Sequence, residues 1–418
     1  MKKLFVTRSA LCVALSVGAQ KQMLSLQKCL EMAQKQNYAV LAGTKSVERA
    51  KAMQGTAWDV DKTDLTLGQD PTSGGSPDNA ISITQSIDFP TLYVAKHKQL
   101  KAETQAEQSK LDVLKSDLAS EVTSVYWQLV YEQQRIRLLA QRDSVLDIHK
   151  QLADKKFQAG ETHRMEVLLA EKVLRENQLE MVAARSEADG VKMQLARLLN
   201  MDATTVSNYA SIVLADTLLQ PLGMVQTSYN YQQSPEGIYA NDRLAVASKA
   251  VTVAKNGYAP SLSLSLRNQL VISGWNPYHQ DRSKFDGGNF MGFEIGVGVP
   301  LFFGATRAKV KAARKDREIL ELEIKEEQRQ REMEYLEALN KCNAAFAHMA
   351  YYQQDGEKKA DELSRLAILE YQNGEISYSE YINVLQESID IRMKHLSAIN
   401  DYNQSVIALR RLTNGKFF

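Results

Sequence analysis

Side chains that could carry out acid–base or metal chemistry are scattered along this sequence of 418 residues. The six histidines occur singly, and no two of them have the spacing of a metal-binding pair. The 13 methionines are dispersed as well, and there is neither a phosphate-binding glycine loop with lysine nor a nucleophile elbow. We therefore expect no catalytic residue, no cofactor, no metal and hence no enzyme. The histidines are His97, His149, His163, His279, His348 and His395.

Three cysteines leave one question of redox chemistry open. Cys12 lies in the N-terminal segment described next, whereas Cys29 and Cys342 lie in helical patterns far apart in the sequence. A disulfide between Cys29 and Cys342 and a pair of buried free thiols are both compatible with an oxidising compartment. We favour the free thiols.

The N-terminus has the pattern of a secretory signal peptide at residues 1–19. Lys2, Lys3 and Arg8 precede an apolar stretch at 10–17, and small residues end the segment, as a signal peptidase requires. The alternative is an N-terminal helix that stays in the cytosol.

Composition indicates a largely helical chain, and its balanced charge does not point to a strongly charged binding partner. The 21 glycines and 8 prolines are few, so long helices with short breaks are expected. Lys and Arg number 51 against 50 Asp and Glu, and a net charge of +1 gives no support to nucleic acid binding. After the signal, no segment approaches the roughly 20 consecutive apolar residues of a membrane-spanning helix, so any crossing would need strands closed into a barrel.

The two halves of the chain are copies of one unit. The segment Phe-Gln-Ala-Gly-Glu at 157–161 recurs as Tyr-Gln-Asn-Gly-Glu at 371–375, which places Gly160 and Gly374 214 residues apart. The same displacement, without a gap, aligns Glu166 with Glu380, Leu195 with Leu409, Arg197 with Arg411, Leu198 with Leu412 and Asn200 with Asn414.

Each copy is expected to contain a helix, a strand pair, a long helix, a tight turn and a returning helix. The first repeat at 20–200 has a helix at about 26–57, strands at 61–69 and 80–89, a long helix at 91–156, a turn at 157–164 and a return helix at 165–200. A linker follows at 201–237, placed as an equatorial belt. The second repeat at 238–418 has a helix to about 256, strands at 261–271 and 291–299, a long helix at 305–371, a turn at 372–378 and a return helix at 379–414.

Apolar residues alternate with small or polar ones in all four strands. Leu65 and Leu67 in the first and Ile81, Ile83 and Ile87 in the second show this period of two. A barrel wall with lipid outside and water inside has this pattern, and a soluble β-sandwich has it too. The linkers within the pairs, 69–78 and 273–289, have the composition of extracellular loops.

The long helices favour the barrel. Each would be on the order of 100 Å long, and a globular core cannot enclose such a rod. Apolar residues such as Leu111, Leu114 and Leu118 recur at three and four positions, so rods would pack into a wall. Four strands are too few to close a barrel. The expected fold is mainly α with a small transmembrane β part, an internal duplication, and a trimeric 12-stranded β-barrel (4 strands per protomer) continuous with a long α-helical barrel.

Four short segments carry a resemblance over essentially the whole mature chain. They are 257–264 entering a strand, 299–304 leaving one, and the paired turns at 157–162 and 371–376. With the duplication, they make the chain similar to the TolC-type outer membrane efflux protein family. The resemblance implies a homotrimer in the outer membrane, embedded in its lipid and extended into the periplasm. As a passive exit duct it would meet a periplasmic adaptor (membrane fusion) protein and, through it, an inner-membrane pump.

Residues 83–90 resemble most the branch that serves pumps of the resistance-nodulation-division type. Many members of that branch carry a lipid on an N-terminal cysteine. Cys12 follows Ala10 and Leu11, which is a poor lipidation signal, and the expected mature start near Gln20 has no cysteine.

The resemblance also assigns roles at the two turns. Gly160, Glu161 and Thr162 in the first and Gly374, Glu375 and Ile376 in the second would form the tunnel tip that docks with the adaptor. The structural alternative is that the glycines only allow a tight reversal between helices.

Beyond the second turn, the resemblance implies a pore gate. Glu380 occupies a place where family members often carry an acidic residue facing the pore, and Asn383 stands where a second carboxylate is common. Three Glu380 side chains in a ring would select cations. The alternative is an ordinary solvated glutamate, and the missing second acid weakens the analogy.

Two other functions compete with the efflux duct. A structural coiled-coil protein of the envelope without channel activity would explain the rods but not the strand pairs. The exit duct of a type I protein secretion system would share the whole fold. The residues leave the cargo open, whether metal ion, drug or peptide.

Overall fold

The structure is a computed structural model that describes residues 23–71, 77–201, 213–223, 229–271 and 289–413. The predicted signal peptide with Cys12 lies outside the described residues, as do 72–76 and 273–288 of the two predicted loops. In chain order the elements are β1 Met23–Leu24, α1 Leu26–Gln36, α2 Tyr38–Met53, the 3-10 turn η1 Gln54–Trp58, β2 Asp64–Pro71, β3 Pro77–Asp88, α3 Pro90–Gln158, α4 Arg164–Leu198, β4 Val213–Leu214, η3 Tyr231–Gln233, α5 Pro235–Lys255, η4 Asn256–Tyr258, β5 Ser261–Val271, β6 Asn289–Gly298, α6 Gly304–Tyr351, the π-helical turn η5 Tyr352–Gly356, α7 Glu357–Asn373 and α8 Tyr378–Thr413.

The long helices form where the chain lacks glycine and proline. Pro90 begins α3, because its fixed φ suits a first helical position, and α3 then continues for 69 residues, about 100 Å. The second long helix, expected at 305–371, is interrupted by η5, which ends at Gly356. No described helix is long and apolar enough to cross a membrane.

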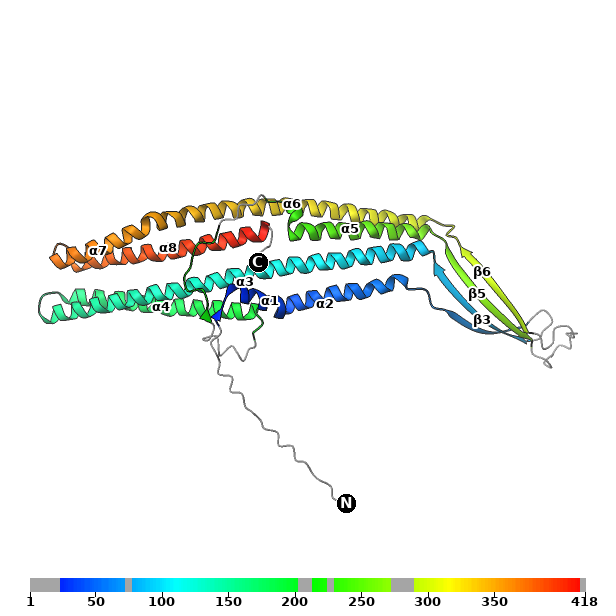
Figure 1. Cartoon of the computed structure of the whole chain (residues 1–418), viewed down its shortest axis with the longest axis horizontal. Coiled ribbons are helices and arrows are strands. Elements are labelled where there is room, and N and C mark those ends of the chain that lie inside the picture. Colours follow the sequence, from blue (N-terminus) through cyan, green and yellow to red (C-terminus); the bar gives the residue numbers. More distant parts are fainter. Residues whose placement is uncertain (1–22, 72–76, 202–212, 224–228, 272–288, 414–418) are drawn as a thin grey trace, which may run out of the picture. The chain divides into compact units, whose positions relative to one another are not determined.

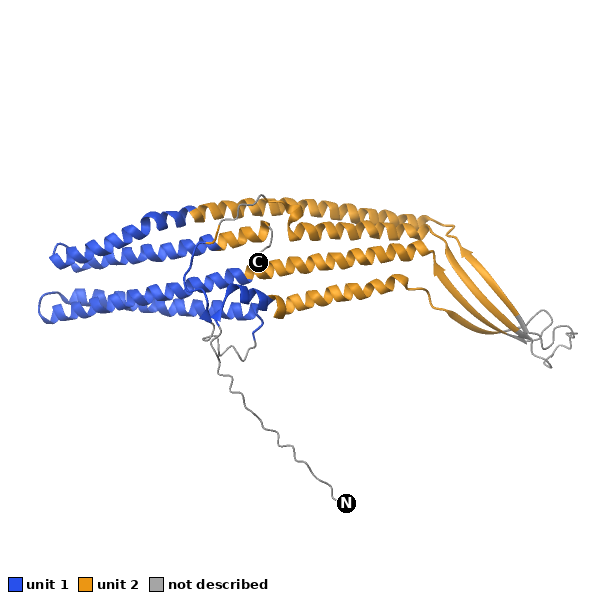
Figure 2. Cartoon of the chain, in the orientation of Figure 1, with its two compact units in different colours: residues 1–33, 122–221, 347–403 blue, residues 34–121, 222–346, 404–418 orange. Residues whose placement is uncertain are grey.

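The chain divides into two units, and each takes segments from both predicted repeats (Figure 2). Unit 1 comprises 1–33, 122–221 and 347–403, and unit 2 comprises 34–121, 222–346 and 404–418. The division into two repeats stays a prediction, although helix, strand pair, long helix and returning helix do follow one another twice along the chain.

Unit 1 contains two helical hairpins. One is formed by α4 and the part of α3 from Val122 onward, and the other by α7 and α8 (Figure 1). Val122, Tyr126 and Leu129 of α3 are fully buried, which is the three- and four-residue spacing that packs one helix against others. Asn177 of α4 is 1% exposed and donates to the Leu139 carbonyl of α3 at 3.2 Å. Such contacts fix the register of the hairpin.

The linker between the predicted repeats contributes a strand that the sequence did not predict. β4 pairs in parallel with β1, with Met23 opposite Val213 and Leu24 opposite Leu214. The buried Tyr126 hydroxyl donates to Asp216 at 2.6 Å and lies 3.2 Å from the Leu24 carbonyl oxygen. Burial and the nearby Asp216 carboxylate raise the pKa of Tyr126. This small sheet therefore fastens the N-terminal segment and part of the linker to α3.

Cys29 and Cys342 are both buried and free, which confirms the prediction of two thiols. Burial raises the pKa of Cys29 to about 11, so it stays protonated at neutral pH.

Unit 2 contains one four-stranded antiparallel sheet of order β2-β3-β5-β6, together with α2, α5 and the adjoining parts of α3 and α6 (Figure 1). The central pair joins the two predicted repeats, because β3 pairs with β5 over eleven positions from Asp78–Val271 to Asp88–Ser261.

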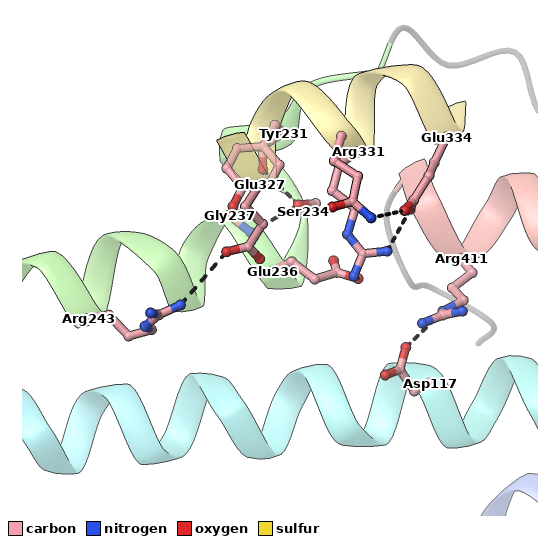
Figure 3. A network of polar contacts seen from close by, with 11 residues as sticks. Asp117, Tyr231, Ser234, Glu236, Gly237, Arg243, Glu327, Arg331, Glu334 and Arg411 are labelled. Atoms are coloured by element: carbon pink, nitrogen blue, oxygen red, sulfur yellow. Dashed lines mark hydrogen bonds and ion pairs between the residues drawn. The ribbon is translucent and has the colours of Figure 1, made fainter. Parts of the chain in front are cut away.

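A polar network holds the start of α5 in unit 2, as Figure 3 shows. Ser234 accepts from the Gly237 amide at 3.1 Å and so caps the helix. A Cβ at Gly237 would collide with the Tyr231 carbonyl, so glycine is required there. Buried Glu236 pairs with Arg331 of α6, which also bonds Glu334 at 2.9 Å.

Candidate functional site

One face of the sheet in unit 2 is apolar and exposed. Leu65, Ile83, Leu266 and Phe293 lie opposite one another in consecutive strands and are 70%, 44%, 49% and 75% exposed. Leu67, Ile81, Leu264, Ile295 and Val297 extend this face and are exposed as well. A single soluble chain rarely presents so large a continuous apolar surface to water, so this face requires a partner or a lipid environment.

The other face carries small and hydroxyl side chains that bond across the strands. The hydroxyls of Thr66 and Ser82 are 2.6 Å apart, and those of Thr84 and Ser265 are 3.0 Å apart. A Cβ at Gly296 would contact the Ser263 hydroxyl, which would have to rotate away, so the two small residues fit beside each other as they stand. The sheet thus separates an apolar surface from a polar surface, as the strands of a channel wall do.

Both edges of this sheet are open in the described residues. β2 pairs only with β3, and β6 pairs only with β5. Unpaired edge strands in lipid would leave backbone groups without hydrogen bonds at a cost of several kcal/mol each. The strand number is even and every pairing is antiparallel. Therefore β6 of one copy could pair with β2 of the next copy, and this pairing would be antiparallel as well.

The two predicted turns have the same backbone geometry in unit 1. Gly160 and Gly374 both have φ of 76°. The amides of Glu161 and Glu375 each donate to the carbonyl five residues earlier at 2.8 Å, and the glycine amides donate three residues back at 3.0 and 3.2 Å. This is the Schellman arrangement, which ends a helix with a left-handed residue.

The predicted docking residues are placed on these turns, in the two hairpins. Gly160, Glu161, Gly374 and Glu375 are exposed, whereas Thr162 and Ile376 are partly buried. Ile376 packs against a hydrophobic cluster formed by α3, α4, α7 and α8. The Thr162 hydroxyl bonds to the Glu166 carboxylate. The structure therefore leaves the glutamates at the turn surface free to meet a partner.

The predicted gate residue Glu380 has a local structural role. Its carboxylate accepts from both the amide and the hydroxyl of Ser377 at 2.8 Å, and Ser377 Oγ lies 3.3 Å from the Glu380 amide. This reciprocal pair is a capping box at the start of α8. The bonds to Ser377 lower the pKa of Glu380, so it is ionised at neutral pH. Asn383 is exposed one turn further.

A set of aromatic and cationic contacts joins the two hairpins, and sequence reasoning missed it. Tyr371 stacks on Tyr381 with ring centroids 4.8 Å apart, and the Lys156 ammonium donates to the Tyr371 hydroxyl at 2.9 Å. The Tyr381 hydroxyl lies 2.8 Å from His149 Nε2. Burial lowers the pKa of His149, and the bond to Tyr371 raises the pKa of Lys156. The tyrosines at 371, 378 and 381 could have been noticed as a series at helical spacing.

A cavity of about 500 Å³ lies beside these contacts, between α3 and the α7–α8 hairpin. Arg142, His149, Tyr371, Tyr381 and Arg392 line it together with apolar side chains. Among the described residues, no cluster of three or more His, Cys, Asp or Glu side chains could hold a metal ion.

Solved structures of outer membrane channels and of an outer membrane protein share this fold. The channel CmeC of Campylobacter jejuni matches with a TM-score of 0.76 at 18% identity, over 94% of this chain and 86% of its own. The outer membrane protein VceC of Vibrio cholerae matches with a TM-score of 0.73 at 15% identity, over 94% of this chain and 97% of its own. The open-state channel MtrE of Neisseria gonorrhoeae matches with a TM-score of 0.71 at 16% identity, over 93% of this chain and 88% of its own. The fold is therefore that of outer membrane channels.

The sequence comparison gives the family. Residues 232–415 match the family model described as outer membrane efflux protein. A search among curated proteins found no match. This match covers the second part of the chain, and the likeness in fold extends over the first part as well. The family match and the shared fold together confirm the resemblance stated from the sequence.

Proposed function

We propose that this protein is the outer-membrane exit duct of a tripartite efflux system. Three chains would join their sheets edge to edge, giving a barrel of 12 strands from the 4 strands of each sheet. The apolar face would meet lipid and the polar face would line a water-filled lumen. The transport energy would come from an inner-membrane pump, and this protein would supply a passive path.

One observation carries the proposal: the sheet is apolar and exposed on one face, polar on the other, and open at both edges. A structural coiled-coil protein has no use for such a sheet. The type I secretion duct remains the second candidate, because the sheet and hairpins suit it equally.

We place the periplasmic adaptor at the two hairpin turns. Gly160, Glu161 and Thr162 in one turn and Gly374, Glu375 and Ile376 in the other have matching backbone geometry, so a trimer would present six similar turns. An adaptor with matching symmetry could use all six. The pump of the resistance-nodulation-division type is proposed on the sequence resemblance of residues 83–90 alone.

The duct function is tested by adding the purified mature protein to planar lipid bilayers. Discrete conductance steps are expected, and a preparation that leaves the bilayer impermeable while being well folded would contradict the proposal. The same recordings test the gate. Glu380→Gln should lower cation selectivity if three Glu380 side chains line the pore, and Glu166→Gln at the matching position of the other hairpin is the control. Unchanged selectivity would leave Glu380 with its capping role only.

A further inference from the structure

Charge is segregated along α6, although the chain as a whole is nearly neutral. The first twelve residues of the helix, 304–315, contain five cations and no carboxylate: Arg307, Lys309, Lys311, Arg314 and Lys315. The next stretch, 316–337, contains nine carboxylates and four cations. The basic part is the part that adjoins the sheet, because β6 ends at Gly298.

The neighbouring helices have the same bias at the same end. The start of α3 carries Lys96, Lys98 and Lys101 before its first carboxylate at Glu103, and the end of α5 carries Lys249 and Lys255. The connection from α2 to β2 is the exception, because it contains Asp59 and Asp61 with one lysine, and Asp64 begins β2.

Side-chain contacts hold these helix ends together within unit 2. Thr91 at the start of α3 donates to Asn256 at the end of α5 at 2.7 Å. The Thr306 hydroxyl of α6 lies 3.5 Å from the Gly257 carbonyl oxygen. Trp58, beyond α2, stacks on Tyr93 of α3 with centroids 5.6 Å apart. Figure 1 shows that α2, α3, α5 and α6 all approach the sheet from the same side. We call the ten cations of 96–101, 249–255 and 307–315 the basic collar.

Most collar cations have no internal partner to neutralise them. Lys98, Lys101, Arg307, Lys309, Lys311 and Arg314 are exposed, and none of them forms an ion pair within the part of the chain that the structure describes. Further along α6, in contrast, Arg317 pairs with Glu321 and Arg331 with Glu334. Unpaired cations at such density repel one another, so an external anion would relieve the repulsion.

Exposed apolar side chains lie between the collar and the sheet. Leu301, Phe302 and Phe303 are 78%, 91% and 50% exposed, and Trp58 and Tyr258 are 58% and 40% exposed. The order from strand to helix is therefore apolar strand face, aromatic side chains, then cations. Aromatic residues at headgroup level followed by Lys and Arg are the profile of a protein surface at a membrane interface with anionic lipid.

We propose, on the basis of the outer-membrane position argued above, that the basic collar binds anionic glycerophospholipid headgroups of the leaflet on the helix side of the sheet. The phosphate groups would accept hydrogen bonds from the Arg and Lys side chains while the acyl chains lie against Leu301, Phe302 and the strand face. The predicted loops 69–78 and 273–289 follow the opposite strand ends, so the collar faces the periplasm.

The test compares two variants with matched charge changes on the full mature protein. One combines Arg307→Gln, Lys309→Gln, Lys311→Gln and Arg314→Gln. The control combines Lys325→Gln, Arg329→Gln, Lys341→Gln and Lys358→Gln, which removes four exposed cations that lie farther from β6 along the chain. Each is reconstituted in phosphatidylcholine, and the association of spin-labelled phosphatidylglycerol relative to labelled phosphatidylcholine is measured by electron spin resonance.

The native protein and the control should prefer phosphatidylglycerol by roughly two- to fivefold, and the collar variant should show no preference. Equal association of the two labelled lipids with the native protein would overturn the proposal. So would a preference for phosphatidylglycerol that survives in the collar variant. A preference for labelled lipid A that is lost in the collar variant would overturn the assignment to glycerophospholipid. Channel recordings on the same samples separate this proposal from the duct function, which fails only if the native protein forms no channels.

Discussion

The two hairpin turns of unit 1 share a backbone and differ in their side chains. Both turns place glycine at φ of 76° with the same pair of hydrogen bonds. In the second turn, Ser377 and Glu380 form a reciprocal cap. At the matching place in the first turn, His163 makes no side-chain cap bond, and Thr162 bonds to Glu166 instead.

The difference extends into the packing behind the turns. Tyr371, Tyr378 and Tyr381 lie on the second hairpin, and the positions 214 residues earlier are Phe157, Arg164 and Val167. The first hairpin contributes His149 and Lys156 as partners for those tyrosines. The two turns thus share a backbone reversal that strongly favours glycine, whereas the side chains behind them differ.

The largest expected effect comes from truncating the aromatic contacts. Tyr381 and Val167 are matching positions and are 3% and 2% exposed. Tyr381→Ala should destabilise the hairpins by about 3–5 kcal/mol, because it leaves a large cavity, and Val167→Ala by about 2 kcal/mol. Hydrogen exchange followed by mass spectrometry measures both, at the α7 and α8 amides for Tyr381→Ala and at the α4 amides for Val167→Ala. Equal effects would show that the two hairpins are packed alike.

A smaller and equal effect is expected at the two glycines. Gly160→Ala and Gly374→Ala each place a Cβ on a left-handed backbone with φ of 76°, at a cost of about 1–2 kcal/mol. No atom lies within 4 Å of either added Cβ, so sterics with neighbours add nothing. Local exchange at the turns should accelerate to the same extent in both variants. A large difference between them would contradict the shared backbone geometry.

The smallest effect is a pH dependence specific to the inter-hairpin contacts. Burial lowers the pKa of His149, so the folded state binds the proton less readily than the unfolded chain. The stability contribution is therefore complete above the ordinary pKa of 6.5 and is lost as the pH falls below it. His149→Leu introduces the residue type found at the matching position, Leu363. This variant should show a weaker pH dependence of the thermal unfolding midpoint between pH 5 and 7 than the native protein. A midpoint with the same slope in both proteins would remove His149 from the account.

The local sequence pattern was sufficient to predict the long helices, the strand pairs and the turns, because each of these depends on nearby residues. The absence of glycine and proline after Pro90 predicted a helix that the structure shows from Pro90 to Gln158. Alternation predicted the strand pairs and which residues share a face, such as Leu65 and Ile83. Gly160 and Gly374 predicted the turns because positive φ strongly favours glycine.

Contacts that depend on distant partners were not predictable. The pairing of β1 with β4 involves only two residues in each strand and brings together positions 190 residues apart, as for Met23 and Val213. The bond from Lys156 to Tyr371 depends on how two hairpins pack, which no local pattern encodes. Glu380 was predicted as a gate by resemblance, and the motif Ser-Tyr-Ser-Glu at 377–380 could have predicted its capping role.

The central claim is that open sheet edges of neighbouring copies close one barrel, and a disulfide between those edges tests it most directly. Thr66 lies on β2 and Glu294 on β6, both on the polar face. Thr66→Cys combined with Glu294→Cys, or with Gly292→Cys if the register requires it, should give oxidised dimers and trimers on non-reducing gels of outer membranes. Thr84→Cys with Glu294→Cys should not, because β3 is an inner strand. Monomers only from the edge pairs, in protein that is folded and in the membrane, would contradict the account.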